Sequence, residues 1–567
     1  MEQRGAMRRR ADRGTGAASL AACLRDPGWV SVILLWAAFP PLGWWWLAWV
    51  APLGWIRWVT SDSSPSYRVV YGCSLLHWLL LLEWVRLPHW SAYFGWLVLA
   101  AYLAIYLPLS VLLARELVHR WRWPSWLAWP VAWTGMELFR SWFLTGFALC
   151  LVGHTQVPCV PLLQVADLAG AYGVGFVLMM VAACVERCWP RGDRRVLRVA
   201  PLGIAVLVLL AASGYGAFRV RQLAALEAAA ATGRTFRAAL IQGSFDTQFD
   251  GDAERPRRAF LDYARLSREA AAAASPSLDL VVWPESMFTA AQPMISYEEP
   301  LQPIEGWELS VDELRQRLDE LADAVGARGA WVTQQTKTPL LAGLEWNHLR
   351  EGRELRYNSA IYLGQDGKLL GRYDKMHRVM FGEYVPLGEW FPWLYRLTPM
   401  PEGLTPGTTP QVFEVGNARV APMICFENTV PHLVRRHVRR LTESGKAPDV
   451  LVTITNDGWF WGSSALDLHL ACGVFRAVEM RRPMLIAANT GFSAWIDAAG
   501  RTRGRGPRRA EGVVQVAQPL PERPAESFYL RRGDLLPGLC LLANLLAAAA
   551  ALVRWAGVRK QDRQKLS

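Results

Sequence analysis

The 567-residue sequence predicts a polytopic α-helical membrane domain of about eight transmembrane helices, joined to one α/β domain. Hydrophobic residues make up 52% of the chain and charged residues only 19%, against roughly 25% charged in a typical soluble protein. The 29 tryptophans are a large excess, and tryptophan prefers the headgroup level of a bilayer. Composition therefore favours a membrane protein over a soluble one.

Eight apolar runs account for the predicted transmembrane helices, since about 20 helical residues cross a hydrocarbon core of roughly 30 Å. The first two runs are short and meet at Pro40-Pro41, so a hairpin is an alternative for them. A cleaved signal peptide fits less well, because apolar runs continue far past any cleavage site. The runs cover residues 27–39, 42–57, 69–85, 91–114, 125–143, 164–185, 199–218 and 535–553.

The distribution of arginine and lysine predicts the orientation of these helices. Basic residues gather in the N-terminal segment 1–26, in alternate loops of the region 27–219, and in the C-terminal tail 555–567. The positive-inside rule then puts both termini in the cytoplasm. Seven crossings place residues 220–533 outside, and an eighth helix at 534–554 returns the chain. No basic face interleaved with aromatics points to nucleic acid, so a nucleic-acid partner is excluded.

The polar region has the pattern of an α/β domain, with short β-rich runs between turns and helical stretches. Helices are predicted at 253–274 and 469–482, hairpin turns at Asp366-Gly367 and at 497–500, and a linker at the alanine-rich stretch 223–232. The predicted strands are 235–241, 278–283, 330–333, 360–363, 420–424, 450–455, 484–489 and 512–516.

Three reactive side chains follow predicted strands of this domain. Glu285 lies near the end of LDLVVWPES, Lys375 follows the hairpin AIYLGQDGKLLGRYDKMH, and Cys425 ends the strand ARVAPMICFEN. Strand ends in α/β folds deliver side chains to a shared crevice. A thiol nucleophile needs a base, and a developing oxyanion needs a cation or N–H donors. The three residues therefore predict one catalytic site.

Other chemistry-bearing residues have plainer interpretations. A free cysteine is most often a small buried hydrophobe, which is how we interpret Cys472. His377 and His469 are predicted to be hydrogen-bonded structural histidines. Glu137 and Arg140 lie three apart on one apolar helix, where they are predicted to neutralise each other. No set of cysteines and histidines has zinc-ligand spacing, so no metal site is predicted.

Several motifs together resemble a known family, and the resemblance covers most of the chain. They are IQGSFD (241–246), WPES (283–286), YNSA (357–360), YDKMH (373–377), FGEYVP (381–386), ICFEN (424–428), NDGWF (456–460), RAVEMRRP (476–483) and NTGFSA (489–494), with FRSWFLTGF (139–147) and QVADLAGAYGVGF (164–176) in the apolar region. The polar motifs resemble the nitrilase (carbon–nitrogen hydrolase) superfamily. The full set is similar to the bacterial apolipoprotein N-acyltransferase family.

This resemblance implies an αββα sandwich and a role for each matched residue. Glu285 matches the general base, Lys375 the oxyanion-stabilising lysine and Cys425 the nucleophile, while Glu383 and Glu427 match two supporting glutamates. The implied activity moves an acyl chain from a phospholipid, through a cysteine thioester, to the α-amine of the diacylglyceryl-cysteine of apolipoproteins. The resemblance further implies a monomer without metal or organic cofactor, in the bacterial inner membrane, with its catalytic domain on the periplasmic side.

Two apolar loops are predicted to enter the outer leaflet and admit acyl chains, because exposed apolar patches of a domain meet a membrane or a partner. The first contains Trp390 and Trp393, and the second is the tip at 459–461. The alternative is that both loops pack in the core. Residues predicted to line the substrate pocket or the lipid-facing loops are Tyr384, Trp390, Trp393, Phe426, Asn456 and Trp459.

The sequence also departs from the family pattern. Met380 stands where proline is usual, Phe426 replaces a frequent tyrosine, and Phe249 is the nearest aromatic to an unmatched tryptophan. The interval between Glu285 and Lys375 is long, with extra turns expected around 296–310 and 338–355. Two alternatives stay open: a membrane-anchored amidase or nitrilase acting on a small substrate, and a scaffold that has lost catalysis. Eight spans exceed the needs of an anchor, and the intact triad argues against a scaffold.

Overall fold

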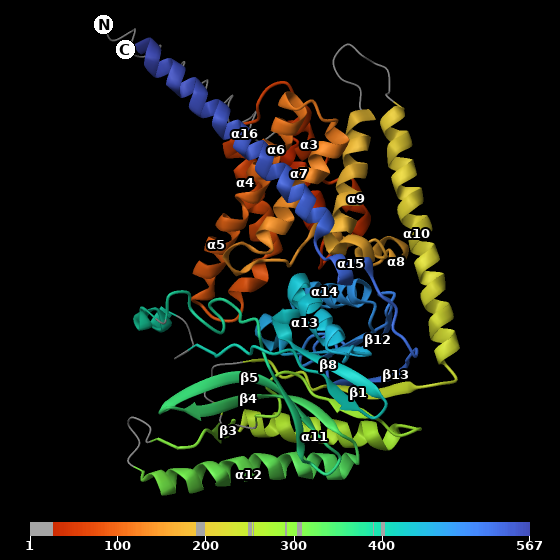
Figure 1. Cartoon of the computed structure of the whole chain (residues 1–567), viewed down its shortest axis with the longest axis vertical. Coiled ribbons are helices and arrows are strands. Elements are labelled where there is room, and N and C mark those ends of the chain that lie inside the picture. The colour runs from red at the N-terminus through yellow and green to blue at the C-terminus, as the bar shows by residue number, and fades with distance from the viewer. Residues whose placement is uncertain are drawn as a thin grey trace.

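The structure, a computed structural model, has a helical part and an α/β part stacked along its long axis (Figure 1). It describes residues 26–188, 199–247, 252, 254–289, 292–302, 309–388, 390–397 and 403–566. The basic N-terminal segment, apart from residue 26, the arginine-rich stretch 189–198 and Phe249 lie outside the described residues.

The helical part gathers segments from both ends of the chain, since the C-terminal helix joins the bundle built by the first 230 residues. Its elements are α2 (Gly28–Ala38), η1 (Trp45–Trp49), α3 (Leu53–Thr60), α4 (Tyr67–Leu81), η2 (Glu83–Arg86), α5 (Ala92–Leu103), α6 (Tyr106–Arg115), η3 (Glu116–Arg120), α7 (Ser125–Arg140), η4 (Phe143–Thr145), η5 (Val152–Gln156), α8 (Val160–Leu163), α9 (Ala166–Cys188), α10 (Ala200–Ala230) and α16 (Leu535–Leu566).

Four helices of the described chain are long and apolar enough, by length and composition, to cross a membrane. They are Ala92–Arg120, Ala166–Cys188, Ala200–Ala230 and Leu535–Arg559, and each contains one of the predicted runs. The other four runs form shorter helices. Run 42–57 is divided into η1 and α3, because Pro52 cannot continue a helix already under way.

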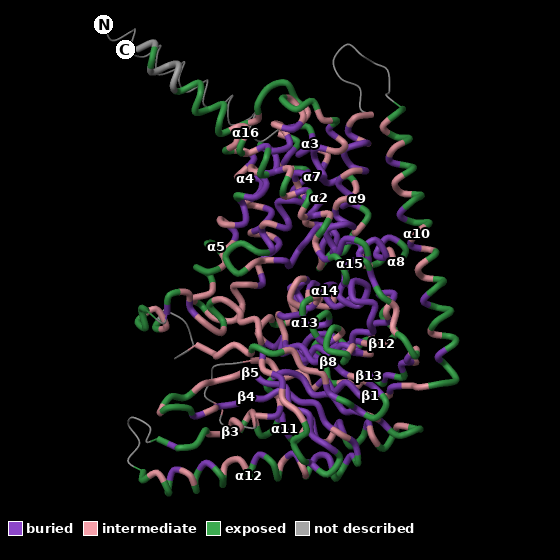
Figure 2. The backbone as a smooth tube through the Cα atoms, viewed as in Figure 1, coloured by how far each residue is buried: buried purple, intermediate pink, exposed green. Residues whose placement is uncertain are grey.

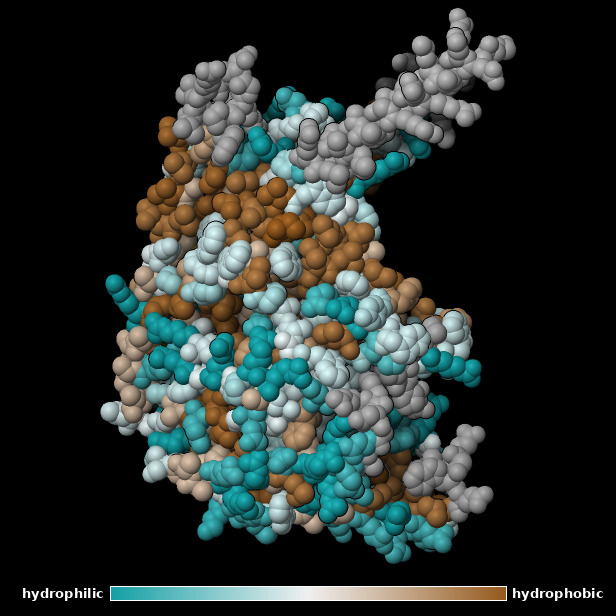
Figure 3. Space-filling model, turned by 180° about the vertical axis from the view of Figure 1, so that it is seen from behind, coloured by the Kyte–Doolittle hydropathy of each residue, from teal (hydrophilic) through white to brown (hydrophobic). Residues whose placement is uncertain are grey.

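The bundle is buried inside and apolar outside. A continuous core joins α2, α3, α4, α6 and α7, whereas exposed leucines and valines line α10 and α16. Figure 2 shows the buried centre, and Figure 3 shows apolar residues gathered over the helical part while hydrophilic residues cover most of the α/β part. A belt of exposed apolar side chains is what a lipid-facing surface requires.

Helix α10 corrects the predicted linker. It continues without a break from its apolar half through the alanine-rich stretch to Ala230, and β1 begins five residues later. Alanine has the highest helix propensity, and nothing in residues 223–230 interrupts the helix. The connection between the two parts is therefore a helical stalk rather than a flexible linker.

The α/β part contains two sheets. The seven-stranded sheet has the order β13-β1-β2-β4-β5-β6, with β3 paired to β4; the six-stranded sheet has the order β12-β11-β10-β9-β8-β7. Their strands are β1 (Thr235–Gln242), β2 (Leu280–Val282), β3 (Met294–Tyr297), β4 (Leu340–Arg350), β5 (Arg353–Leu363), β6 (Leu369–Asp374), β7 (Phe413–Val415), β8 (Ala418–Ile424), β9 (Val450–Thr455), β10 (Met484–Ala488), β11 (Ala494–Ile496), β12 (Thr502–Arg505) and β13 (Gly512–Pro519).

The sheets lie face to face between two helical layers, which is the αββα sandwich implied by the resemblance. Helices α11 (Arg255–Ala273) and α12 (Val311–Thr336) cover the seven-stranded sheet, and α13 (Pro431–Glu443), α14 (Ala465–Met480) and α15 (Phe528–Arg532) lie between the other sheet and the membrane bundle (Figure 1). In β9, Val450, Val452 and Ile454 face the core between the sheets, and Leu451 faces α13 and α14. This alternation follows from the two-residue period of a strand.

Two predictions within this domain are wrong. Residues 330–333, predicted as a strand, lie in α12, whose apolar positions Leu314, Leu318, Val325 and Val332 share one helical face. A capping box at Ser310 and Glu313 starts that helix. Residues 338–355, expected to be extra turns, form most of β4 and the start of β5. The predicted helices and both hairpin turns are confirmed.

A buried ion cluster joins the helical bundle to the α14 layer of the α/β part. The Asp167 carboxylate of α9 accepts hydrogen bonds from Arg481 at the end of α14 at 2.5 and 2.9 Å. It also accepts from Tyr215 and Arg219 of α10, at 2.6 and 2.7 Å. One carboxylate thus connects three helices, and the sharing of an anion among several donors favours a fixed geometry between the two parts.

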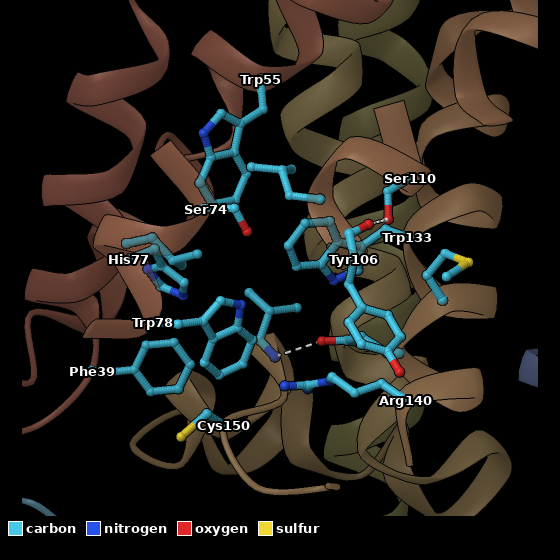
Figure 4. A pocket seen from close by; sticks show the side chains of 15 residues that line it. Phe39, Trp55, Ser74, His77, Trp78, Tyr106, Ser110, Trp133, Arg140 and Cys150 are labelled. Atoms are coloured by element: carbon cyan, nitrogen blue, oxygen red, sulfur yellow. Dashed lines mark hydrogen bonds between the residues drawn. The ribbon is translucent and has the colours of Figure 1, made fainter. Parts of the chain in front are cut away.

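Glu137 and Arg140 do not pair directly. Glu137 accepts a hydrogen bond from the backbone N–H of Val152 at 3.0 Å, and the Arg140 guanidinium lies over the Trp78 ring, 4.8 Å from its centroid. Both side chains line a pocket walled by aromatic rings, and Figure 4 shows Arg140 at one end of it. The carboxylate thus has a backbone contact and the guanidinium a cation–π contact, and the two charges still act on each other without a direct ion pair.

Candidate active site

Three strand ends from both sheets bring the predicted triad together. Glu285 follows β2 and Lys375 follows β6 in the seven-stranded sheet, and Cys425 follows β8 in the six-stranded sheet. The approach of β4 to β2 is so close that a Cβ on Gly343 would lie 2.6 Å from the Glu285 Cα. Only glycine fits there, so the position of Glu285 is fixed by its neighbouring strand.

Lys375 is held between two carboxylates. Its Nζ donates to Glu285 Oε1 at 3.2 Å and to Glu383 Oε1 at 2.7 Å, and its side chain is only 3% exposed. The Asn358 amide donates to the same two oxygens, at 2.7 and 3.3 Å. Backbone N–H groups of Asn456 and Val379 donate to the remaining oxygens at 2.9 and 2.8 Å. Each oxygen of the two buried carboxylates therefore accepts at least one hydrogen bond.

The electrostatics of Lys375 favour its charged form. Burial alone lowers the pKa of an ammonium group, but the Glu285 and Glu383 carboxylates outweigh that effect and hold the pKa of Lys375 well above its usual range. A permanently charged ammonium group beside a thiol is able to stabilise a negative oxygen as it develops.

Cys425 stands at a strained point of the backbone. Its φ is +53°, in the left-handed region, where the strand β8 turns directly into the short helix η7 (Cys425–Thr429). Non-glycine residues adopt this conformation at a cost, and such strain is concentrated at functional sites. Burial and the Glu285 charge raise the pKa of the Cys425 thiol, while Lys375 and the Thr455 hydroxyl lower it. The net effect is a raised pKa, so the thiol is neutral at rest and needs a base to become the thiolate.

Glu427 connects the lysine segment to the cysteine segment. Its carboxylate accepts from the backbone N–H of Met376 and His377 at 2.7 and 3.1 Å, and from the N–H of Ile424 at 2.8 Å. The Tyr373 hydroxyl donates to it at 2.8 Å. Burial raises the pKa of Glu427, whereas these donors lower it. The predicted supporting glutamate therefore lies in the wall of the site rather than in its opening.

The remaining predicted pocket residues lie around this centre. The Phe426 ring stacks on His377, with centroids 5.9 Å apart, and Tyr384 lies beneath the Arg378 guanidinium, 4.5 Å from it. Asn456 contacts Glu285 through its backbone, and its side-chain oxygen accepts from Gly458 N–H at 3.1 Å. Trp459 is half-buried beside them.

The two predicted apolar loops differ in exposure. The first, residues 381–388 and 390–397, is named here the aromatic loop; Trp390 is 78% exposed and Trp393 58% exposed. In the second loop only Trp461 is exposed, because Phe460 packs edge-on against Trp84 of the bundle at 5.1 Å. The core alternative is therefore wrong for Trp390 and Trp393. The second tip instead contacts the helical part.

Several residues of the site were not singled out from the sequence. Asn358 lies in the YNSA motif, so the motif marked its position without a role. Tyr373 is the first residue of the YDKMH motif, which marked its position without a role, and no signal in the sequence distinguishes the strand residue Thr455. His469, predicted to be a hydrogen-bonded histidine, contacts Asp457 Oδ1 and the Cys425 carbonyl oxygen, each at 3.1 Å.

Comparisons with known proteins agree with this arrangement. The carbon-nitrogen hydrolase family matches residues 237–523, and the apolipoprotein N-acyltransferase N-terminal domain matches residues 31–184. The apolipoprotein N-acyltransferase of Rhodopirellula baltica is 32% identical, over 92% of this chain and 96% of its own. That of Geobacter metallireducens is 33% identical, over 93% of this chain and 94% of its own. Both regions of the chain are thus matched together in single relatives.

Solved structures with similarity to this chain include an amidase from Nesterenkonia. It is 17% identical, has a TM-score of 0.35, and its alignment covers 54% of this chain and 99% of the amidase.

Proposed function

The chain belongs to the apolipoprotein N-acyltransferase family, and we infer that it acylates the N-terminal amine of apolipoproteins. The observation that carries this inference is a buried ammonium–carboxylate pair from one sheet beside a strained thiol from the other, next to an apolar helical bundle. Acyl transfer through a thioester uses each of these groups.

In the first half-reaction, the thiolate of Cys425 attacks the sn-1 ester carbonyl of a phospholipid. Glu285 accepts the thiol proton, and the Lys375 ammonium stabilises the oxyanion of the tetrahedral intermediate. The C–O bond then breaks, Glu285 returns the proton to the leaving alkoxide, and a lysophospholipid departs. Cys425 is left carrying the acyl chain as a thioester.

In the second half-reaction, the α-amine of the diacylglyceryl-cysteine attacks the thioester. Glu285 removes a proton from the amine, the C–S bond breaks, and the proton passes to the thiolate of Cys425. The N-acylated lipoprotein leaves, and the thiol is restored. Glu383 keeps Lys375 in place through both halves, since its Oε1 lies 2.7 Å from the Lys375 Nζ. The two substrates react in turn, which gives ping-pong kinetics.

The domain boundaries and the orientation in the membrane follow from the same proposal. Residues 27–219 cross the inner membrane seven times, with shorter helices such as α2, α4 and α7 completing crossings inside the bundle. Residues 220–533 lie in the periplasm, residues 534–554 return, and the N-terminal segment and residues 555–567 are cytoplasmic. The protein acts as a monomer. Basic residues on the cytoplasmic loops support this orientation.

The aromatic loop gives the lipid substrates their path to the triad. It contains Glu383 of the site, and it exposes Phe381, Leu387 and both tryptophans. Apolar side chains of this size are stabilised by about 1.5–3 kcal/mol each when they leave water, which favours insertion into the leaflet. The loop therefore lies where an acyl chain enters.

Replacing Trp390 and Trp393 together by glutamate is expected to slow acyl-enzyme formation from phospholipid vesicles by about tenfold, because charged side chains resist insertion. A water-soluble short-chain thioester should still acylate Cys425 at close to the wild-type rate. The matched control is Trp331→Glu, an exposed tryptophan on α12 far from the bundle. Equal rates on vesicles for all three proteins would contradict lipid contact by the loop.

The proposed function is tested by following a labelled acyl chain. Purified protein is mixed with a phospholipid labelled in its sn-1 chain, and hydroxylamine-sensitive label on the protein is measured. Addition of a diacylglyceryl-cysteine peptide is then expected to move the label to the peptide amine. Cys425→Ala should take up none. A protein that stays unlabelled yet hydrolyses a small amide would instead be an amidase, and a protein inactive in both assays would be a scaffold.

A further inference from the structure

His469 makes two contacts that fix its protonation. The side chain extends from α14 and lies between η8 (Asp457–Phe460) and η7. Its Nδ1 is 3.1 Å from the Asp457 Oδ1, and its Nε2 is 3.1 Å from the backbone oxygen of Cys425. Both distances are those of hydrogen bonds.

The hydrogens on the two ring nitrogens of His469 determine the charge of its imidazole. A carbonyl oxygen only accepts, so Nε2 must carry a hydrogen to bond with it. A carboxylate also only accepts, so Nδ1 carries a hydrogen as well. With hydrogens on both nitrogens, the imidazole is a cation.

We propose that His469 is an imidazolium positioning residue, which neutralises Asp457 and holds the strained carbonyl of Cys425 in place for thiolate formation. The proposal deepens the proposed function by adding a charged residue to the same site.

The charges around Cys425 explain why the imidazolium matters. Among the described residues, the groups that act on the ring are Asp457 from η8, Glu285 from the end of β2 and the backbone of Cys425. Burial lowers the pKa of His469, but these partners outweigh it and raise that pKa above its usual value. If the ring loses its proton, the buried Asp457 charge is left unopposed beside the thiol and disfavours the thiolate.

A short relay connects the same groups to the sulfur. The Thr455 hydroxyl donates to Asp457 Oδ1 at 3.1 Å, and the same hydroxyl interacts with the Cys425 thiol. Asp457 is thus joined to both ends of Cys425, through Thr455 to its sulfur and through His469 to its carbonyl. Such a closed set of contacts is suited to preserving an unfavourable φ through the reaction.

The test measures the reactivity of Cys425 with iodoacetamide, which needs no lipid substrate. The rate is followed by mass spectrometry of the peptide that contains Cys425, in the intact protein. His469→Gln retains an N–H donor but has no charge, so we expect alkylation at pH 6.5 to slow about tenfold, one pKa unit of thiolate stabilisation. Removing the opposing charge as well, in Asp457→Asn/His469→Gln, should restore the rate to within about twofold of wild type.

The pH profile gives a second readout. Because the pKa of His469 is raised, its cation persists to higher pH than a free imidazolium does, and it is lost as pH rises through that raised pKa. Acyl-enzyme formation by the wild type should therefore fall above this pH, and His469→Gln should lack that step. A wild-type pH profile in His469→Gln, or equally slow alkylation in the single and double variants, would overturn the proposal. A wild type that alkylates as expected but takes no acyl chain would instead refute the proposed function alone.

Discussion

Lys375→Met is expected to reduce acyl-enzyme formation by about 10³-fold, the upper end of the range in which single oxyanion-stabilising groups contribute. Methionine matches the length and volume of the lysine stem but carries no charge. The Glu285 and Glu383 carboxylates then face each other without the ammonium that separates them, and one of them takes up a proton. Both the oxyanion contact and the base are affected. The initial rate of labelling from phospholipid measures the loss.

A double variant separates catalysis from folding in this experiment. Breaking a buried pair costs about 3–5 kcal/mol, so Lys375→Met alone should also lower the melting temperature. Adding Glu383→Gln removes one of the two opposed carboxylates, and we expect the melting temperature to recover while labelling stays absent. Recovery of labelling in the double variant would show that the ammonium only balances charge.

Glu427→Gln is expected to lower the free energy of unfolding by about 2–4 kcal/mol and to slow acyl-enzyme formation by roughly 100-fold. The carboxylate accepts from three backbone N–H groups and the Tyr373 hydroxyl, using both oxygens. A glutamine has only one oxygen, so its amide nitrogen must face at least one buried donor. Losing these hydrogen bonds should disturb the segments of both Cys425 and Lys375, because Ile424 directly precedes Cys425 and Met376 directly follows Lys375.

Thermal unfolding in detergent and the initial labelling rate measure the two effects of this change. Glu443→Gln is the matched control, since its carboxylate forms an exposed pair with Arg439 at 2.6 Å. Exposed pairs contribute no more than about 1 kcal/mol, and labelling should be unchanged. If both glutamine variants behaved alike, the linking role of Glu427 would be refuted.

The sequence predicted the strands that carry the reactive side chains because each is a short apolar run bounded by turns. Strand β9 matches its prediction at both ends, and β8 ends at Ile424 as expected. Helix α12 was not predicted from the sequence, and one reason is that Trp331, Val332 and Thr333 favour a strand locally. Its packing against the sheet overrides that preference.

Contacts between distant segments were less accessible to sequence reasoning. Asn358 reaches Glu285 across 73 residues, and His469 reaches Cys425 across 44. No local pattern encodes such pairs, so motif positions were predicted without their partners. The lengths of the short membrane helices were overestimated for a related reason. Hydropathy measures where a segment is apolar, whereas a helix ends where its neighbours can cover its backbone.

The division of the triad between two sheets has a mechanical consequence. Cys425 belongs to the layer against the membrane bundle, and Glu285 and Lys375 belong to the outer layer, so their alignment depends on the apolar seam between the layers and on the few hydrogen bonds of Glu427 and Asn456 that cross it. Sliding one layer by about 1 Å would leave the ladders of both sheets intact yet remove most of the activity. A compound that binds in that seam would therefore inhibit the enzyme without contacting any reacting atom.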